Sequence, residues 1–127
     1  MTAIRAADQD NNAATEPDPT WLPLLATPPY PSYPGNHSCI GASAARALER
    51  VFGRNDISFS VTWTGTGGAA DFTRPYNGFR ELADQEAKSR IYGGIHFEFE
   101  TLASFGVCTR VADYAVDNYL RARFPSR

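Results

Sequence analysis

The 127-residue sequence lacks long apolar runs and has few cysteines. No stretch approaches the roughly 18 consecutive apolar residues that a membrane-spanning helix needs. Cys39 and Cys108 are too few for the disulfide framework of a small secreted domain. Their positions do not reveal whether they pair, and we expect both to be small buried apolar groups. The chain is therefore predicted to be soluble and to have no membrane span.

The N-terminus also lacks a basic region that leads into an apolar core. That pattern is the mark of a secretory signal peptide, so none is expected in the chain as given. Residues 8 to 19 are instead mostly polar. The sequence assigns the protein to no particular compartment.

An excess of charge of one sign is missing as well. Twelve basic and fourteen acidic residues give a formal net charge of −2. Such a balance creates no broad field that would attract nucleic acid or an anionic membrane. Any anion must therefore be held locally. A hydrophobic content of 43% over this length is sufficient for one globular domain.

Proline is concentrated at one end of the chain. Residues 1–36 contain seven of the nine prolines, which exclude regular helix through most of this segment. The apolar residues Trp21, Leu25 and Tyr33 are among several that make it too apolar for a free tail. We expect residues 1–36 to form a proline-rich arm that packs on another part of the protein, and residues 37–127 to form a helical domain.

The apolar periodicity after residue 36 predicts three helices and at most one short strand. A first helix is expected from residue 37 to 52 with Gly53 as its stop, a second over 77–92, and a third over 96–123. Alternation of apolar and polar residues over 57–63 predicts the strand. The expected fold class is therefore mainly α.

The first histidine lies where the arm enters the first predicted helix. Gly35, Asn36 and His37 occupy this transition, where unpaired N–H groups and the positive end of the helix dipole favour an anion. A phosphate-like ligand would fit there. The alternative is an ordinary N-terminal cap with an incidental surface histidine.

The second histidine follows a turn between two predicted helices. Arg90 offers a planar fork suited to oxyanions, and the adjacent glycines 93 and 94 allow a sharp turn before His96. Glu100 is four residues after His96, which would place both on one helical face. The carboxylate could then bond one ring nitrogen and direct the other toward a ligand. The alternative is a simple helical turn with a solvated arginine and an ordinary histidine–glutamate pair.

Together the two segments resemble the superfamily of vanadium-dependent haloperoxidases and type 2 phosphatidic acid phosphatases, and most of all its soluble bacterial haloperoxidase-like members. The pattern of that superfamily is Lys-x6-Arg-Pro, then Pro-Ser-Gly-His, then Ser-Arg-x5-His. Ser89, Arg90 and His96 match the third motif in full. The second motif matches at Pro34 and His37, whereas Gly35 and Asn36 replace the serine and the glycine of the family.

The first motif of the superfamily has no counterpart. The single Arg-Pro pair, at residues 74 and 75, follows His37 instead of preceding it, and Lys88 is the sole lysine. In relatives the Arg-Pro pair is followed closely by a segment similar to residues 2–5. We therefore expect this chain to be the C-terminal helical-bundle part of the fold, truncated just after the missing motif. Apolar faces that upstream helices should cover would leave it marginally stable.

The resemblance implies a role for each matching residue. His96 would be bonded to the vanadium of vanadate in a haloperoxidase, or would form phosphohistidine in a phosphatase. Arg90 would bind equatorial oxygens of the anion, and His37 would act opposite His96 as a general acid or base. The remaining expected participants are Gly35, Asn36 through its backbone N–H, and Ser89 at the anion, with Glu100 orienting His96.

The leading hypothesis is a vanadium-dependent haloperoxidase fragment, in which the cofactor vanadate helps hydrogen peroxide to oxidise a halide. The second is an acid phosphatase that hydrolyses a phosphomonoester without a cofactor, since vanadate mimics the transition state of phosphoryl transfer. The third, favoured by the missing motif, is a non-catalytic remnant or interaction module. Small-molecule partners and no nucleic acid are expected, and a homo-oligomer stays open. Cys39 beside His37 has no second pair at zinc-type spacing, which argues against a divalent-metal site.

Overall fold

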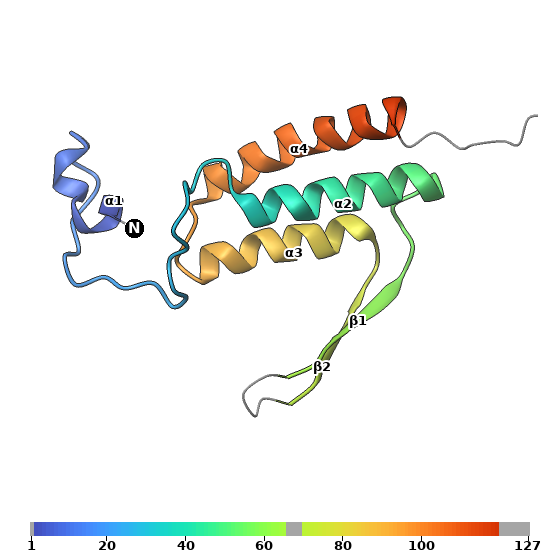
Figure 1. Ribbon diagram of the computed structural model, residues 1–127. Helices are drawn as coiled ribbons and strands as arrows, with labels where there is room; N and C mark the ends of the chain where they lie inside the picture. The colour runs from blue at the N-terminus through green and yellow to red at the C-terminus, as the bar shows by residue number, and fades with distance from the viewer. Residues whose placement is uncertain (1, 66–69, 120–127) are drawn as a thin grey trace, which may run out of the picture.

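The computed structural model of the chain describes residues 2–65 and 70–119. Three long helices lie side by side, with α2 against both α3 and α4 (Figure 1). A hairpin that connects the C-terminal end of α2 to the N-terminal end of α3 extends away from them. The elements in chain order are α1 (Thr2–Arg5), a 3-10 turn (Ala7–Gln9), α2 (Asn36–Phe52), β1 (Phe59–Trp63), β2 (Phe72–Tyr76), α3 (Phe79–Tyr92) and α4 (Glu98–Asn118). The predicted mainly α class is confirmed.

The ends of α2 and α3 follow from local chemistry. Helix α2 ends at Gly53 in the left-handed conformation, with φ of 71°, as the sequence predicted. Helix α3 begins at Phe79, two residues later than expected. Asn55 caps it from the preceding loop: its backbone carbonyl accepts the N–H of Phe79 at 3.3 Å, and its side-chain oxygen accepts that of Arg80 at 2.9 Å.

The predicted start of the last helix at residue 96 is wrong. Helix α4 begins at Glu98, and His96 lies in the loop before it. The carboxylate of Glu100, in the first turn, accepts the N–H of Phe97 at 3.0 Å and so fixes the helix start after that residue. Helix α4 extends to Asn118. Residues 120–123 of the predicted helix lie outside the described residues.

The expectation of at most one short strand is also wrong. Strands β1 and β2 pair antiparallel, with Phe59 opposite Tyr76 and Trp63 opposite Phe72. Both pairs of rings stack across the hairpin with centroids 5.5 Å apart, a favourable cross-strand contact. Pro75 lies in β2 opposite Ser60, although proline cannot donate a hydrogen bond to a ladder. It is tolerated here because both strands of a two-stranded hairpin are edge strands.

A disulfide joins α2 to α4. Cys39 and Cys108 are bonded, with their Cα atoms 5.2 Å apart. The expectation that both are merely small buried apolar groups is therefore wrong, although Cys108 is buried. The pairing depends on how α2 packs against α4, which the spacing of the two cysteines along the sequence does not encode. It fixes the first turn of α2, two residues after His37, to the middle of α4.

Ion pairs join the same two helices further along. The carboxylate of Asp113 on α4 accepts hydrogen bonds from Arg46 at 2.8 Å and Arg50 at 2.7 Å, both on α2. Arg50 also pairs with Asp117. The side chain of Asp113 is about one-third exposed, with 30% of its surface accessible. The network therefore makes a modest, salt-sensitive contribution to stability.

The core is small and much apolar surface remains exposed. Ala45, Phe79 and Ala83 form the buried cluster, with partly buried Ile57, Phe59 and Phe105 packed around it. Large apolar side chains with more than half of their surface exposed include Ile40, Val51, Leu102 and Val111. Apolar grooves lie between α2 and α3 and between α2 and α4. This balance supports the expected marginal stability. No helix in residues 2–65 and 70–119 combines the length and apolarity that crossing a membrane requires.

Removal of the disulfide should lower the free energy of unfolding. For Cys39→Ser together with Cys108→Ser we expect a loss of about 2–4 kcal/mol, because the bond closes a long loop and restricts the unfolded chain. Urea denaturation followed by circular dichroism measures the change. Dithiothreitol should destabilise the wild-type chain and leave the double variant unaffected. An equal effect of the reductant on both would contradict the prediction.

The Asp113 network should make stability depend on acid pH. Hydrogen bonds from Arg46 and Arg50 lower the pKa of Asp113 below 3.8 in the folded state. A carboxylate with a depressed folded pKa contributes stability above its unfolded pKa, and this is lost as pH falls below about 4. Asp113→Asn should therefore weaken the decline of the unfolding free energy between about pH 4 and pH 2. Asp84→Asn, on α3, serves as the control, and identical acid profiles for wild type and Asp113→Asn would contradict the assignment.

Candidate anion site

Three predicted site residues meet at one end of the helical layer. His37 comes from the first turn of α2, Arg90 from the last turn of α3, and His96 from the loop before α4. Burial is the main cause that lowers the pKa of His37, and repulsion from the positive charge of Arg90, and from His96 when it is protonated, lowers it further. Charges act on one another in this way only over short distances. The structure thus brings together a guanidinium and two imidazoles from three separate elements.

His96 is held with one nitrogen engaged and the other free. Its side chain is buried, and Nδ1 lies 2.8 Å from Oε2 of Glu100. Its Nε2 is buried and has no hydrogen-bond partner among the described residues. An ionised carboxylate can only accept, so Nδ1 carries a hydrogen, and in the neutral form of the imidazole Nε2 keeps its lone pair. The predicted Glu100–His96 pair is therefore present, although His96 precedes the helix.

Glu100 is ionised despite its burial. Burial raises the pKa of its carboxyl, but hydrogen bonds from Ser32, His96 and the N–H of Phe97 outweigh this effect and leave the pKa below its usual value. A carboxylate that is charged at neutral pH is the form that accepts the Nδ1 hydrogen of His96. The orientation of the imidazole is thus maintained in the physiological range.

Arg90 organises the loop through its backbone carbonyl. Its carbonyl accepts the N–H groups of Ile95 at 3.1 Å and His96 at 3.3 Å. Gly94, with φ of 72°, permits the turn that makes these bonds possible. The Nε of Arg90 is buried and has no hydrogen-bond partner among the described residues. Unpaired buried donors are costly, so this nitrogen is suited to an oxyanion.

The start of α2 contributes backbone donors. Gly35 is the N-cap and provides no side-chain bond. Its own N–H donates to the carbonyl of Glu100 at 3.3 Å. Asn36 is the exposed first residue of the helix, where N–H groups lack helical partners. A Cβ atom on Gly35 would lie 3.3 Å from Oγ of Ser104, so the serine of the family motif would need a small shift there.

The hydroxyl of Ser89 is bonded within α3. It is exposed, and the hydroxyl donates to the carbonyl of Glu86 at 2.6 Å, one turn earlier in α3. Its contribution to an anion site stays a prediction, as do the roles of Gly35 and Asn36.

The proline-rich arm supplies site neighbours that the sequence did not reveal. Ser32 donates a hydrogen bond to Oε1 of Glu100 at 2.7 Å, and the hydroxyl of Tyr30 lies 3.5 Å from Nδ1 of His37. The N–H of Leu25 also bonds the carbonyl of Gly93 at 3.0 Å. The expected packing of the arm is thus observed, on the loop that carries His96. Its apolar content was the one sequence signal, and nothing distinguished Ser32 or Tyr30 from their neighbours.

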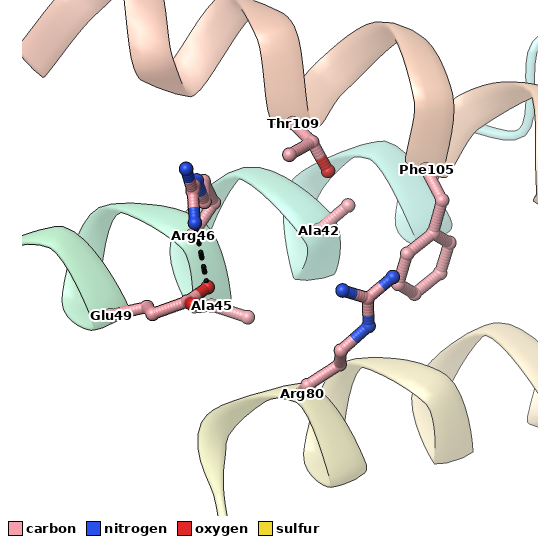
Figure 2. A pocket seen from close by; sticks show the side chains of 7 residues that line it. All are labelled: Ala42, Ala45, Arg46, Glu49, Arg80, Phe105 and Thr109. Carbon is pink, nitrogen blue, oxygen red and sulfur yellow. Dashed lines mark ion pairs between the residues drawn. The ribbon is translucent and has the colours of Figure 1, made fainter. Parts of the chain in front are cut away.

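The hollow between the three long helices is separate from this site. A hollow of about 80 Å³ lies between the middle of α2 and its two neighbours. Figure 2 shows Arg46 paired with Glu49 there and Arg80 extending beside Phe105, with none of the predicted site residues in the lining. Within residues 2–65 and 70–119, no group of three or more His, Cys, Asp or Glu side chains is placed to hold a metal ion. A guanidinium with two imidazoles is a combination of side chains that suits an anion.

Comparison with known families agrees with this geometry. Residues 1–123 match the family described as VCPO second helical-bundle domain. The chain belongs to this family. The second-bundle domain of a vanadium haloperoxidase is the expected C-terminal part of that fold, so the predicted family is confirmed. Among the curated proteins, none matches the sequence.

Solved structures of bacterial vanadium-dependent haloperoxidases are similar to this chain. A bacterial vanadium-dependent iodoperoxidase is 32% identical, with a TM-score of 0.69 over 79% of this chain and 24% of its own. Holo and apo forms of a bacterial vanadium-dependent chloroperoxidase are each 17% identical, with TM-scores of 0.66 and 0.64 over 78% and 76% of this chain. They cover 23% of their own chains and show the shared fold alone. The present chain thus spans about a quarter of the length of the proteins in these structures.

Substitution of Arg90 should raise the pKa of His37. The positive charge of the guanidinium opposes protonation of His37, so Arg90→Gln removes one of the causes that lower this pKa. A proton NMR titration of the imidazole signals measures the shift, since the chain has two histidines. Arg80→Gln, at the opposite end of α3, should leave the titration unchanged. A His37 pKa that is the same in wild type and Arg90→Gln would show that the two side chains do not interact.

Proposed function

We propose that His96, Arg90 and the start of α2 bind vanadate, and that this domain serves a haloperoxidase that oxidises a halide with hydrogen peroxide. The observation that carries the proposal is the Nε2 atom of His96, which is buried, lacks a partner among the described residues and is oriented by Glu100. Family membership supports the same chemistry.

The residues present fit an oxyanion. The lone pair of His96 Nε2 would bond the central atom, and the unpaired Nε of Arg90 would donate to an oxygen. First-turn N–H groups of α2, at Asn36 and His37, would add donors at the positive end of a helix. When bound, vanadate would activate hydrogen peroxide toward the halide while keeping its oxidation state.

His37 would serve as the acid–base group of the site. Its pKa lies below 6.5, so it is neutral at pH 7 and can accept a proton there. A bound oxyanion would offset the positive charge of Arg90 and raise this pKa, which would allow His37 to return the proton during the reaction. The Nδ1 atom of His37 lies 3.5 Å from the hydroxyl of Tyr30.

The chain holds fewer cations than a strong oxyanion site needs. The Lys-x6-Arg-Pro motif is absent, which leaves Arg90 as the one arginine of the three sequence motifs. A multiply charged anion gains most of its affinity from such groups. Residues 1–127 alone are therefore proposed to bind vanadate weakly and to be feeble catalysts.

Vanadate binding tests the proposal directly. Titration of residues 1–127 with orthovanadate, followed by ⁵¹V NMR, should show binding. His96→Ala and Arg90→Ala should each weaken it by about 10- to 100-fold, the size expected for a lost bond to a charged group. Arg80→Ala is the matched control and should bind as wild type does. Equal affinity of His96→Ala and wild type would refute the assigned ligand.

Two activity assays separate the rival functions. Peroxide- and vanadate-dependent halogenation of a dye, above the level of His96→Ala, supports the haloperoxidase. Hydrolysis of p-nitrophenyl phosphate without halogenation would instead favour a phosphatase. Absence of vanadate binding would favour a non-catalytic interaction module. Robust halogenation by residues 1–127, combined with cooperative unfolding, would contradict the expected weakness of the isolated chain.

A further inference from the structure

We propose that Ser32, in the proline-rich arm, is a positioning residue that holds the Glu100 carboxylate so that Nε2 of His96 stays free and directed into the anion site. The identity of the anion rests on the proposed function, whereas the positioning itself does not depend on it. The proposal gives the arm a role in the chemistry of the site in addition to its packing role.

The contacts form one continuous chain from the arm to the imidazole. Ser32 Oγ donates to Oε1 of Glu100 at 2.7 Å. The other oxygen, Oε2, accepts from Nδ1 of His96 at 2.8 Å and from the N–H of Phe97 at 3.0 Å. Both oxygens of the carboxylate are therefore bonded, and each faces a different segment of the chain. This division of donors determines the rotation of the carboxylate about its terminal torsion.

Burial of Glu100 makes each donor to its carboxylate important, while Ser32 itself lies at the surface. Glu100 is 4% exposed and His96 is 3% exposed. Among the described residues, Ser32 is the one donor to Oε1. A buried carboxylate oxygen without a donor is costly, so loss of the hydroxyl favours rotation of the carboxylate toward other donors. Such rotation weakens the bond to Nδ1, and the hydrogen can then occupy either ring nitrogen.

The arm has other attachments that do not involve Ser32. Leu25 bonds Gly93 through the backbone, and the ring of Tyr33 stacks on that of Phe99 with centroids 6.1 Å apart. Tyr30 lies beside His37. Loss of one hydroxyl at Ser32 should therefore leave the arm in place, and His37 reports independently whether it has moved.

The experiment compares the ring nitrogens of both histidines in residues 1–127 without vanadate. Nitrogen-15 NMR at one fixed pH distinguishes protonated from unprotonated ring nitrogens. Wild-type His96 should show a single tautomer with the hydrogen on Nδ1. Ser32→Ala should show a second population with the hydrogen on Nε2, while the signals of His37 stay unchanged. Ser32→Thr, which keeps the hydroxyl, should restore the wild-type pattern.

Vanadate affinity provides the second measurement. Ser32→Ala should bind orthovanadate about 10-fold less tightly than wild type, the lower end of the loss for residues that orient a ligand. Thr27→Ala, in the same arm, is the control. An unchanged His96 tautomer in Ser32→Ala would overturn the proposal, whatever the affinity. Shifts at both histidines, unrescued by Ser32→Thr, would assign Ser32 a packing role alone. A tautomer shift in a chain that does not bind vanadate would support the positioning role and refute the proposed function.

Discussion

Three segments around the site converge on Glu100. Its carboxylate bonds the arm through Ser32 and the imidazole of His96, and it caps the start of α4 through the N–H of Phe97. Its backbone carbonyl accepts the N–H of Gly35 and the hydroxyl of Ser104. One residue thus connects the arm, the start of α2 and the start of α4. Because a buried carboxylate requires several donors, these segments have few alternative arrangements.

The site is built with unsatisfied polar atoms. The Nε of Arg90 and the Nε2 of His96 are buried and lack partners within the described part of the chain. Groups of this kind lower stability unless a ligand satisfies them. The positive charge of Arg90 near His37 adds to the same cost when His37 is protonated. A domain with a small apolar core therefore gives up some of its stability at the position where an anion would restore it.

Local patterns predicted the helices well and tertiary contacts poorly. Apolar periodicity and Gly53 identified α2 with its end, because both signals lie within a few neighbouring residues. The start of α4, the second strand and the Cys39–Cys108 bond were missed, since each depends on contacts between distant parts of the chain. At the site, motifs located both histidines and Arg90. Ser32 was missed because an arm without periodicity gives no indication of which side chain will face inward.

The disulfide also determines what the chain can lose without coming apart. The covalent ring that it closes runs from Cys39 to Cys108 and contains the hairpin, Arg90 and His96. His37 lies outside the ring, two residues before Cys39. A single backbone cut anywhere within the ring would leave both pieces linked in one molecule. The two histidines and the arginine would therefore remain together after such a cut, as long as the environment stays oxidising.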